Sequence, residues 1–148
     1  ARRTSHELLL EIIPSKSSAP VDDMTLARAI DRFYDLGIFP DWWKLPDPGS
    51  ATAWTNVAAA IDRRDPYCRG VLLLGLDAPA EALEESFARA AANPICKGFA
   101  IGRTIFGAAA RAWFAGRIDD AEAVRQMAAV FGRLIQSWDG LRAQAKAA

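Results

Sequence analysis

The chain has 148 residues, of which 51% are hydrophobic and 24% are charged, and these are the proportions of a globular domain and not of a disordered segment. Lysine plus arginine and aspartate plus glutamate each number 18, so no net charge attracts nucleic acid or a membrane surface. Because the sequence contains neither a signal peptide nor an apolar run of about 18 residues, we expect a cytoplasmic protein with no membrane and no nucleic-acid partner.

The first half of the chain predicts two strands, each followed by a helix. Residues 7–13 form a short apolar run that ends before a proline, which is typical of a strand end. Residues 24–36 carry apolar side chains at helical spacing, and Gly37 is a typical helix stop. A second short strand is predicted at 41–45, and Ser50 is a suitable N-cap for a helix that runs to residue 64.

The second half predicts two more strand and helix units and one extra helix. Residues 70–76 are apolar almost without interruption, which favours a strand buried on both faces of a parallel sheet. A helix at 80–92, a strand at 95–101 and a helix at 105–115 follow. From residue 119 to the end we expect a long helix, capped by Asp119 or Asp120. Its predicted inner face consists of Val124, Met127, Val130, Phe131, Leu134, Ile135 and Trp138.

The order of these elements is (βα)4 with an extra C-terminal helix, an α/β pattern that implies a parallel sheet with right-handed crossovers. Four units are too few for a closed barrel of eight strands, which takes about 250 residues. A small open sheet and the C-terminal half of a TIM barrel remain. We favour the half barrel because the segments Gly70–Gly75 and Gly98–Gly102 put small residues at strand ends, where barrel loops bind ligands.

The first residue of the chain is Ala1 and not methionine, so we expect that residues 1–148 are a single half-barrel domain cut from a longer protein. Half a barrel exposes two sheet edges, which favours pairing with another element of structure. The expected partner is the missing N-terminal half barrel or a second copy of the chain.

Polar residues stand at the carboxyl ends of the first two strands, where parallel α/β folds gather functional groups. Glu11 lies near the end of the first strand and Lys44 near the end of the second. Partial desolvation of Lys44 by its apolar neighbours would favour the neutral amine, which can add to a ketone and form a Schiff base. Glu11 is a suitable acid/base partner. The alternative is a lysine that reaches solvent and forms an ion pair with Glu11.

A phosphate site is predicted beyond the last strand. Gly102, Arg103 and Thr104 open a helix there, and helix amides together with a guanidinium bind phosphate. Gly75 follows the third strand and would let a ligand approach the backbone closely. A surface arginine in an ion pair and a simple turn glycine are the alternatives. Arg69 and Lys97 begin strands at the opposite end of the sheet, so we interpret them as structural.

No metal and no cofactor is predicted. The chain has one histidine, His6, and its two cysteines, Cys68 and Cys96, lack the spacing of a zinc site. Buried, reduced thiols are the expected state of both cysteines. The sequence contains no P-loop and no GxGxxG segment, so nucleotide binding has little support.

Four segments of the chain, LLLEIIP, DWWKLPDP, RDPYCRGVLLLGLDAP and KGFAIGRTIFGAAARAW, resemble a domain of bacterial inositol catabolism. This domain is often fused to 5-dehydro-2-deoxygluconokinase and is known as a 2-deoxy-5-keto-gluconate 6-phosphate aldolase. The resemblance runs from about His6 to Trp138. It implies a carbon–carbon lyase with a β/α-barrel fold, a phosphorylated sugar acid as substrate and a sugar kinase domain as a fusion partner.

More distantly, the strand ends resemble class I aldolases of the tagatose-bisphosphate type. The resemblance implies that Lys44 forms the Schiff base and that Glu11 is the acid/base. It implies phosphate contacts at Gly75, Gly102 and Arg103. That type carries a Lys-x-Glu-x-Pro run, whereas Pro46 stands here in the place of the glutamate, so the corresponding substrate contact stays open. The alternative function is a non-catalytic sugar-phosphate-binding or interaction module attached to a sugar kinase.

Overall fold

The computed structural model describes residues 1–14, 20–75 and 80–147. The strands in this part of the chain are β1 (Leu9–Glu11), β2 (Trp42–Leu45), β3 (Gly70–Leu73) and β4 (Cys96–Phe99). The helices are α1 (Thr25–Asp35), α2 (Ala51–Arg64), α3 (Ala80–Ala91), α4 (Arg103–Phe114) and α5 (Asp120–Ala147), preceded by a short 3-10 helix at Arg2–Thr4. The predicted α/β order, with an extra helix at the end, is confirmed.

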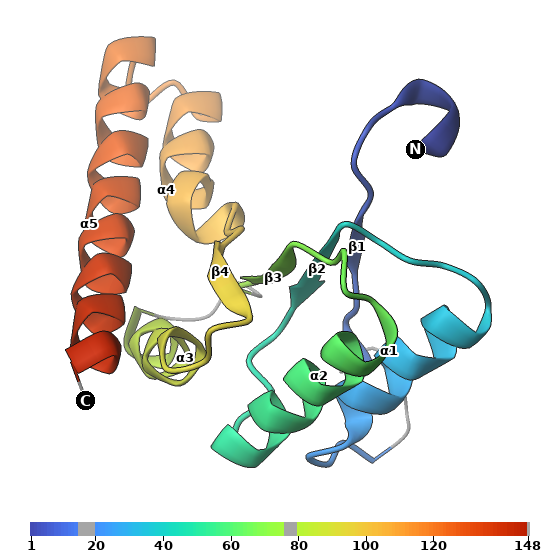
Figure 1. The fold of residues 1–148 in the computed structure, drawn as a ribbon. Helices are drawn as coiled ribbons and strands as arrows, with labels where there is room; N and C mark the ends of the chain where they lie inside the picture. The colour runs from blue at the N-terminus through green and yellow to red at the C-terminus, as the bar shows by residue number, and fades with distance from the viewer. Residues whose placement is uncertain (15–19, 76–79, 148) are drawn as a thin grey trace.

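The sheet is parallel, with its strands in the order β1-β2-β3-β4. Each crossover moves the chain in the same direction along the sheet, and because such crossovers are right-handed, successive helices fall on the same face. Figure 1 shows α1, α2 and α3 on one side of the sheet. This winding is compatible with a half barrel, whereas a doubly wound sheet carries helices on both faces. In the described part of the chain the sheet is open, with β1 and β4 as its edges.

The core lies between the sheet and the helices that cover it. Side chains alternate along a strand, and the alternate residues that face the helices, such as Trp43, Leu45 and Leu73, are fully buried. They pack against the apolar faces of the helices, which supply Leu26, Ile30, Trp54, Val57, Ile61 and Phe87. The other alternate residues of β2, Trp42 and Lys44, are only half-buried. The face of the sheet opposite the core is thus where polar residues such as Lys44 can stand.

The predicted helices and strands occur in the observed order, but their predicted lengths are less accurate. The strands predicted at 7–13 and 70–76 are longer than the observed β1 and β3, and Leu76 lies outside the described residues. Helix α4 begins at Arg103, two residues before the predicted start. The predicted cap of α2 is confirmed, because the Ser50 hydroxyl accepts a hydrogen bond from the Ala53 N–H at 3.0 Å.

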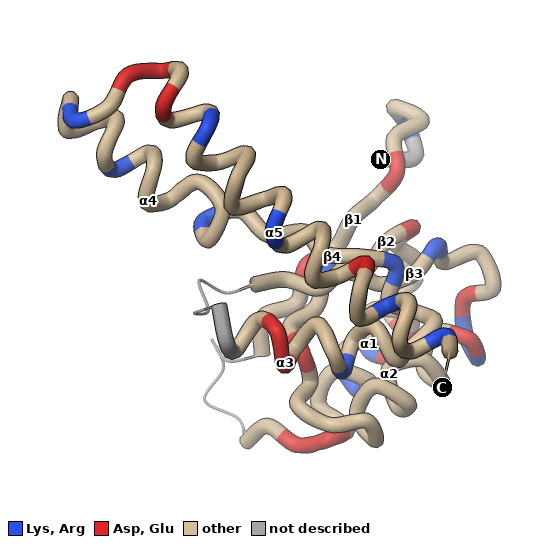
Figure 2. The backbone as a smooth tube through the Cα atoms, turned by 90° about the vertical axis from the view of Figure 1, so that its left-hand side faces the viewer, with Lys and Arg blue, Asp and Glu red and all other residues tan. Residues whose placement is uncertain are grey.

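The predicted inner face of α5 is partly wrong, because Val124, Phe131 and Ile135 are exposed, whereas Met127, Val130 and Leu134 are half-buried. Trp138 is buried, but Val124 is 65% exposed and Phe131 45% exposed. Figure 2 shows that the first half of α5 runs beside α4 and away from the sheet, and at the end of this half the Phe131 ring meets the Phe99 ring of β4 at 6.1 Å between centroids. Although α5 has 28 residues, neither it nor any other helix in the described ranges has an apolar stretch that could cross a membrane.

The Trp43 indole at the centre of the core donates a buried hydrogen bond from Nε1 to the Tyr34 hydroxyl at 3.1 Å. Replacing Tyr34 by phenylalanine leaves that N–H without its acceptor and should lower the free energy of unfolding by about 1–3 kcal/mol.

Burial also raises the pKa of Tyr34 above its ordinary value of 10.0. Above about pH 10 the unfolded state therefore loses this proton first, and stability falls as the pH rises.

Urea unfolding of the wild type and of Tyr34→Phe, at neutral and at alkaline pH, tests both effects. The variant should be less stable at neutral pH and should lose less stability than the wild type between neutral and alkaline pH, because it has no phenol to titrate. Equal stability of the two proteins at neutral pH would contradict the expected contribution of the hydrogen bond.

Candidate functional site

Two adjacent strands bring Lys44 and Glu11 together. The parallel pairing of β1 with β2 sets Glu11 opposite Lys44 in register, and side chains of paired residues point to the same face of a sheet. Lys44 Nζ lies 3.4 Å from Glu11 Oε2. The neighbours of Lys44 in the strand, Trp43 and Leu45, are buried on the opposite face. Lys44 therefore stands on the face away from the helices.

The ion pair itself contributes little to stability. The side chains of Lys44 and Glu11 are 24% and 39% exposed, and partly exposed pairs of this kind contribute about 0–1 kcal/mol. The fold therefore does not depend on this pair, and its position beside a cavity favours a role in binding or chemistry.

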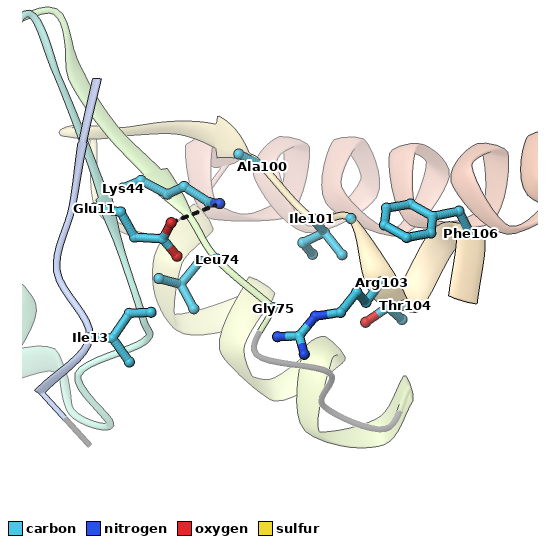
Figure 3. A pocket seen from close by; sticks show the side chains of 11 residues that line it. Glu11, Ile13, Lys44, Leu74, Gly75, Ala100, Ile101, Arg103, Thr104 and Phe106 are labelled. Carbon is cyan, nitrogen blue, oxygen red and sulfur yellow. Dashed lines mark hydrogen bonds and ion pairs between the residues drawn. The ribbon is translucent and has the colours of Figure 1, made fainter. Parts of the chain in front are cut away.

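The cavity beside the pair has a volume of about 350 Å³, which lies at the low end of the range for small-molecule sites. Figure 3 shows it between the ends of β1 and β2, where Glu11 and Lys44 stand, and the start of α4. Its wall includes all five residues that the sequence singles out, Glu11, Lys44, Gly75, Gly102 and Arg103. It also includes Thr104, to which the sequence analysis gives no separate role, and five residues that sequence reasoning missed, Ile13, Leu74, Ala100, Ile101 and Phe106.

The beginning of α4 forms the far wall of the cavity. Gly102 precedes the helix without a side-chain cap, and the first turn contains no acidic residue. The amides of such a first turn and the positive end of the helix dipole favour an anion. Arg103 is the first residue of α4, and its side chain extends along the cavity wall in Figure 3. This end of the cavity thus suits an anionic group.

The two glycines of the cavity wall have steric reasons to be glycine. A Cβ atom on Gly75 would lie 3.1 Å from side-chain carbons of Ile101, and one on Gly102 would lie 3.0 Å from the Phe106 ring. The side chains of Ile101 and Phe106 therefore fill the space that a larger residue would need. Close packing against the cavity wall explains these glycines without requiring direct contact with a ligand.

The acidic residue that follows the lysine strand, Asp47, does not line the cavity. Its nearly buried carboxylate accepts hydrogen bonds from Arg89 Nε at 2.7 Å and from Trp54 Nε1 at 3.1 Å. The loop after β2 is thereby anchored to α3 and to α2. Asp47 consequently does not take the place of the glutamate that the aldolase-like pattern has after its lysine.

The two basic residues that we interpreted as structural lie away from the cavity. Arg69 forms an ion pair with Glu7 at 2.8 Å, and Lys97 Nζ donates to the Pro94 carbonyl at 2.8 Å. Neither residue lines the cavity, in agreement with the interpretation that both are structural. Over residues 1–14, 20–75 and 80–147, no three His, Cys, Asp or Glu side chains form a group that could hold a metal ion.

Both cysteines are free thiols, as predicted. Cys96 is buried and Cys68 is half-buried. Burial raises the pKa of the Cys68 thiol and raises that of Cys96 to about 11. Because the thiolate is the reactive form of cysteine, burial disfavours the reactive form of both side chains.

Comparison with known protein families matches residues 1–142 to a family model. The matching family is described as an uncharacterised protein conserved in bacteria (DUF2090). A search of curated proteins found no match to the chain.

Proposed function

We propose that this chain, which belongs to the bacterial family DUF2090, is the C-terminal half of a cytoplasmic class I aldolase. The proposed enzyme is a carbon–carbon lyase that cleaves a phosphorylated keto sugar acid through a Schiff base on Lys44. The substrate that the sequence resemblance suggests is 2-deoxy-5-keto-gluconate 6-phosphate, an intermediate of myo-inositol catabolism. The observation that carries the proposal is the approach of Lys44 to Glu11, at 3.4 Å, on the wall of a cavity that ends at an uncapped helix N-terminus.

The geometry suits both halves of Schiff-base chemistry. Glu11 lies within reach to take a proton from the Lys44 ammonium, which frees the amine to attack the keto carbon. The same carboxyl group can return this proton to the hydroxyl that leaves as water, and the iminium forms. The iminium then acts as the electron acceptor for the step that breaks the carbon–carbon bond.

Cleavage begins when a base removes the proton from the hydroxyl two carbons away from the iminium carbon. The hydroxyl-bearing carbon becomes a carbonyl, and its bond to the carbon next to the iminium carbon breaks. The electron pair of that bond moves into the iminium to give an enamine. Protonation of the enamine at carbon and hydrolysis regenerate Lys44. With the suggested substrate, the two products are malonate semialdehyde and dihydroxyacetone phosphate.

Reductive trapping tests the proposal directly. The full-length protein is incubated with substrate and borohydride, which reduces an iminium to a stable secondary amine, and the modified peptide is identified by mass spectrometry. The proposal expects the adduct on Lys44 and activity that EDTA does not reduce. Absence of an adduct, with substrate present in excess, would contradict it.

Glu11→Gln should slow turnover by about 10²–10⁴-fold, because the amide keeps the size of the side chain but cannot transfer protons. Glu7→Gln is the matched control, since Glu7 binds Trp42 Nε1 and Arg69 away from the cavity. Steady-state rates of both variants with the same substrate provide the comparison. A similar rate loss in the two variants would show that the effect is structural.

The open sheet supports the partner that the proposal requires. The strands β1 and β4 are both edges of the described sheet, and Glu11 lies on one of them. An N-terminal half barrel, in a longer chain or in a second subunit, would cover these edges and close the site. Mass measurement of the protein in solution, with and without the preceding half of the gene product, distinguishes these arrangements.

The second candidate function is a non-catalytic module that binds sugar phosphates or attaches to a sugar kinase. The partly exposed ion pair favours it, because Lys44 and Glu11 satisfy each other without any substrate. In this case Lys44→Ala would leave pathway flux unchanged, whereas deletion of the whole domain would destabilise the kinase.

A further inference from the structure

Helix α4 and the first half of α5 form a helical arm that projects from the sheet (Figure 1, Figure 2). The helix that covers β4 is the second half of α5, where the Trp138 ring meets the rings of Phe87 and Phe99 at 5.5 and 6.2 Å between centroids. Helix α4 packs mainly against α5. Within the part of the chain that the structure describes, one face of the arm is therefore left uncovered.

The uncovered face of the arm is apolar. Phe106 and Trp113 are seven residues apart on α4, and Val124 and Phe131 are seven residues apart on α5, so each pair lies along one side of its helix. The arm patch consists of the exposed side chains Phe106, Trp113, Phe114, Val124, Phe131 and Ile135. Contiguous apolar surface of this kind marks an interaction site, whereas single exposed apolar residues do not.

A groove and a ridge lie beside each other on this face. The groove has a volume of about 450 Å³, and its apolar lining is Ala110, Trp113, Phe114, Ala123, Val124 and Met127. Ala123 is buried in it, whereas Phe114 is 81% exposed and stands out from the surface together with Val124. The Trp113 indole is held in place, because its Nε1 donates to Asp120 Oδ1 at 2.6 Å. A face with an ordered groove and a ridge can fit a twofold copy of itself.

The area of the arm patch matches what a dimer requires. A fully exposed aromatic side chain presents about 150–250 Å², so at their exposed fractions the six side chains present about 500–600 Å² in total. A dimer interface of standard size buries about 800 Å² of each partner, and about 65% of a homodimer interface is apolar. The arm patch thus supplies the apolar part of one interface.

The charges of the chain also favour a second copy as the partner. Lysine plus arginine and aspartate plus glutamate both number 18, so two copies do not repel each other through a net charge. The charged residues around the turn of the arm have both signs, with Arg111 and Arg117 before Asp119 and Asp120. Opposite charges can therefore meet across a twofold axis.

We propose that a second copy of this chain docks on the arm patch about a twofold axis, so that Phe114 and Val124 of each copy enter the groove of the other. Both residues lie close to the turn between α4 and α5, at the end of the arm away from the sheet (Figure 2). A half barrel that pairs with β1 and β4 lies beside the sheet instead. The inference goes beyond the proposed reaction and does not depend on it.

Sedimentation equilibrium of the full-length protein tests the inference. The wild type should have twice the mass of one chain and should dissociate on dilution. Phe114→Lys and Val124→Glu each place a charge in the interface, and the helix dipole tolerates both, because Phe114 ends α4 and Val124 lies near the start of α5. Each variant should weaken dimerisation by about 30-fold or more. Tyr67→Lys is the matched control, since Tyr67 is 89% exposed and lies between α2 and β3, outside the arm.

A monomeric wild type, or a dimer that neither arm variant weakens, would overturn the inference. Circular dichroism and urea unfolding show whether each variant folds, and the two substitutions lie in different helices, so one folded variant is sufficient. If both arm variants fail to fold, the patch is covered within the full-length chain, and the inference also falls. Borohydride trapping at Lys44 is a separate measurement, so failure of the aldolase proposal would leave the dimer unaffected.

Discussion

Replacing Lys44 by alanine should abolish the borohydride adduct and lower turnover of the keto acid by about 10³-fold or more, the usual cost of removing a covalent nucleophile. The fold should tolerate the change. Lys44 is half-buried on the face away from the core, and its ion pair with Glu11 contributes about 0–1 kcal/mol. A large loss of activity in a protein of nearly normal stability is the expected result, measured by steady-state kinetics and urea unfolding.

Lys44→Arg separates the nucleophile from the ion pair. Arginine keeps the positive charge opposite Glu11, but its guanidinium does not deprotonate in proteins and forms no Schiff base. If Lys44 is only an ion-pair partner, Lys44→Arg should behave like the wild type. If Lys44 is the nucleophile, Lys44→Arg should be as inactive as Lys44→Ala. Lys97→Ala is the matched control, because Lys97 belongs to the same sheet and binds the Pro94 carbonyl away from the cavity.

The pairing of Lys44 with Glu11 could be predicted because it depends on regular features of parallel sheets. Side chains alternate between the two faces of a strand, so Lys44 points to the face away from Trp43 and Leu45. The carboxyl ends of adjacent parallel strands also meet at one edge of the sheet. The observed register adds only that Glu11 is directly opposite Lys44. Residues on strand ends are therefore the part of this site that the sequence pattern determines.

The buried, unpaired state of the Thr104 oxygen could not be predicted, because it depends on packing that the sequence pattern does not describe. The hydroxyl is notable only because its oxygen is buried and unpaired, and both properties arise from neighbouring side chains. The exposure of Val124 on α5 is a similar case, since the helical spacing of apolar residues does not reveal how far a helix extends beyond its sheet.

The glycines likewise differ in what the sequence can predict and what depends on packing. Gly75 and Gly102 attract attention in the sequence because they follow strands, but neither has a backbone conformation that only glycine adopts readily. Gly70, at the start of β3, has a φ of 135°, a value that other residues rarely adopt. The need for glycine at position 70 cannot be predicted from the local sequence, because the atoms that crowd it belong to Ile95 and Lys97, about 25 residues later.

Gly70→Ala should be among the most destabilising single substitutions in this chain. A Cβ atom at this position would lie 2.6 Å from the Ile95 carbonyl oxygen and 2.7 Å from Lys97 Cγ. The Ile95 carbonyl accepts the hydrogen bond from the Val71 N–H at 2.9 Å, so relieving the clash would separate β3 from β4. Backbone strain and steric overlap together should lower the free energy of unfolding by about 3 kcal/mol or more.

Gly98→Ala provides the control on the paired strand. A Cβ atom on Gly98 would meet nothing closer than Leu72 Cδ2 at 3.9 Å, an ordinary van der Waals distance. Alanine also reduces the conformational entropy of the unfolded chain, so this variant should be as stable as the wild type or slightly more stable. Urea unfolding of the two variants gives the comparison, and similar stabilities would show that β4 can shift away from Gly70 at little cost. A loss confined to Gly70→Ala would instead mean that the close approach of β4 to β3, which brings Gly75 and Ile101 together in the cavity wall, depends on the missing side chain at Gly70.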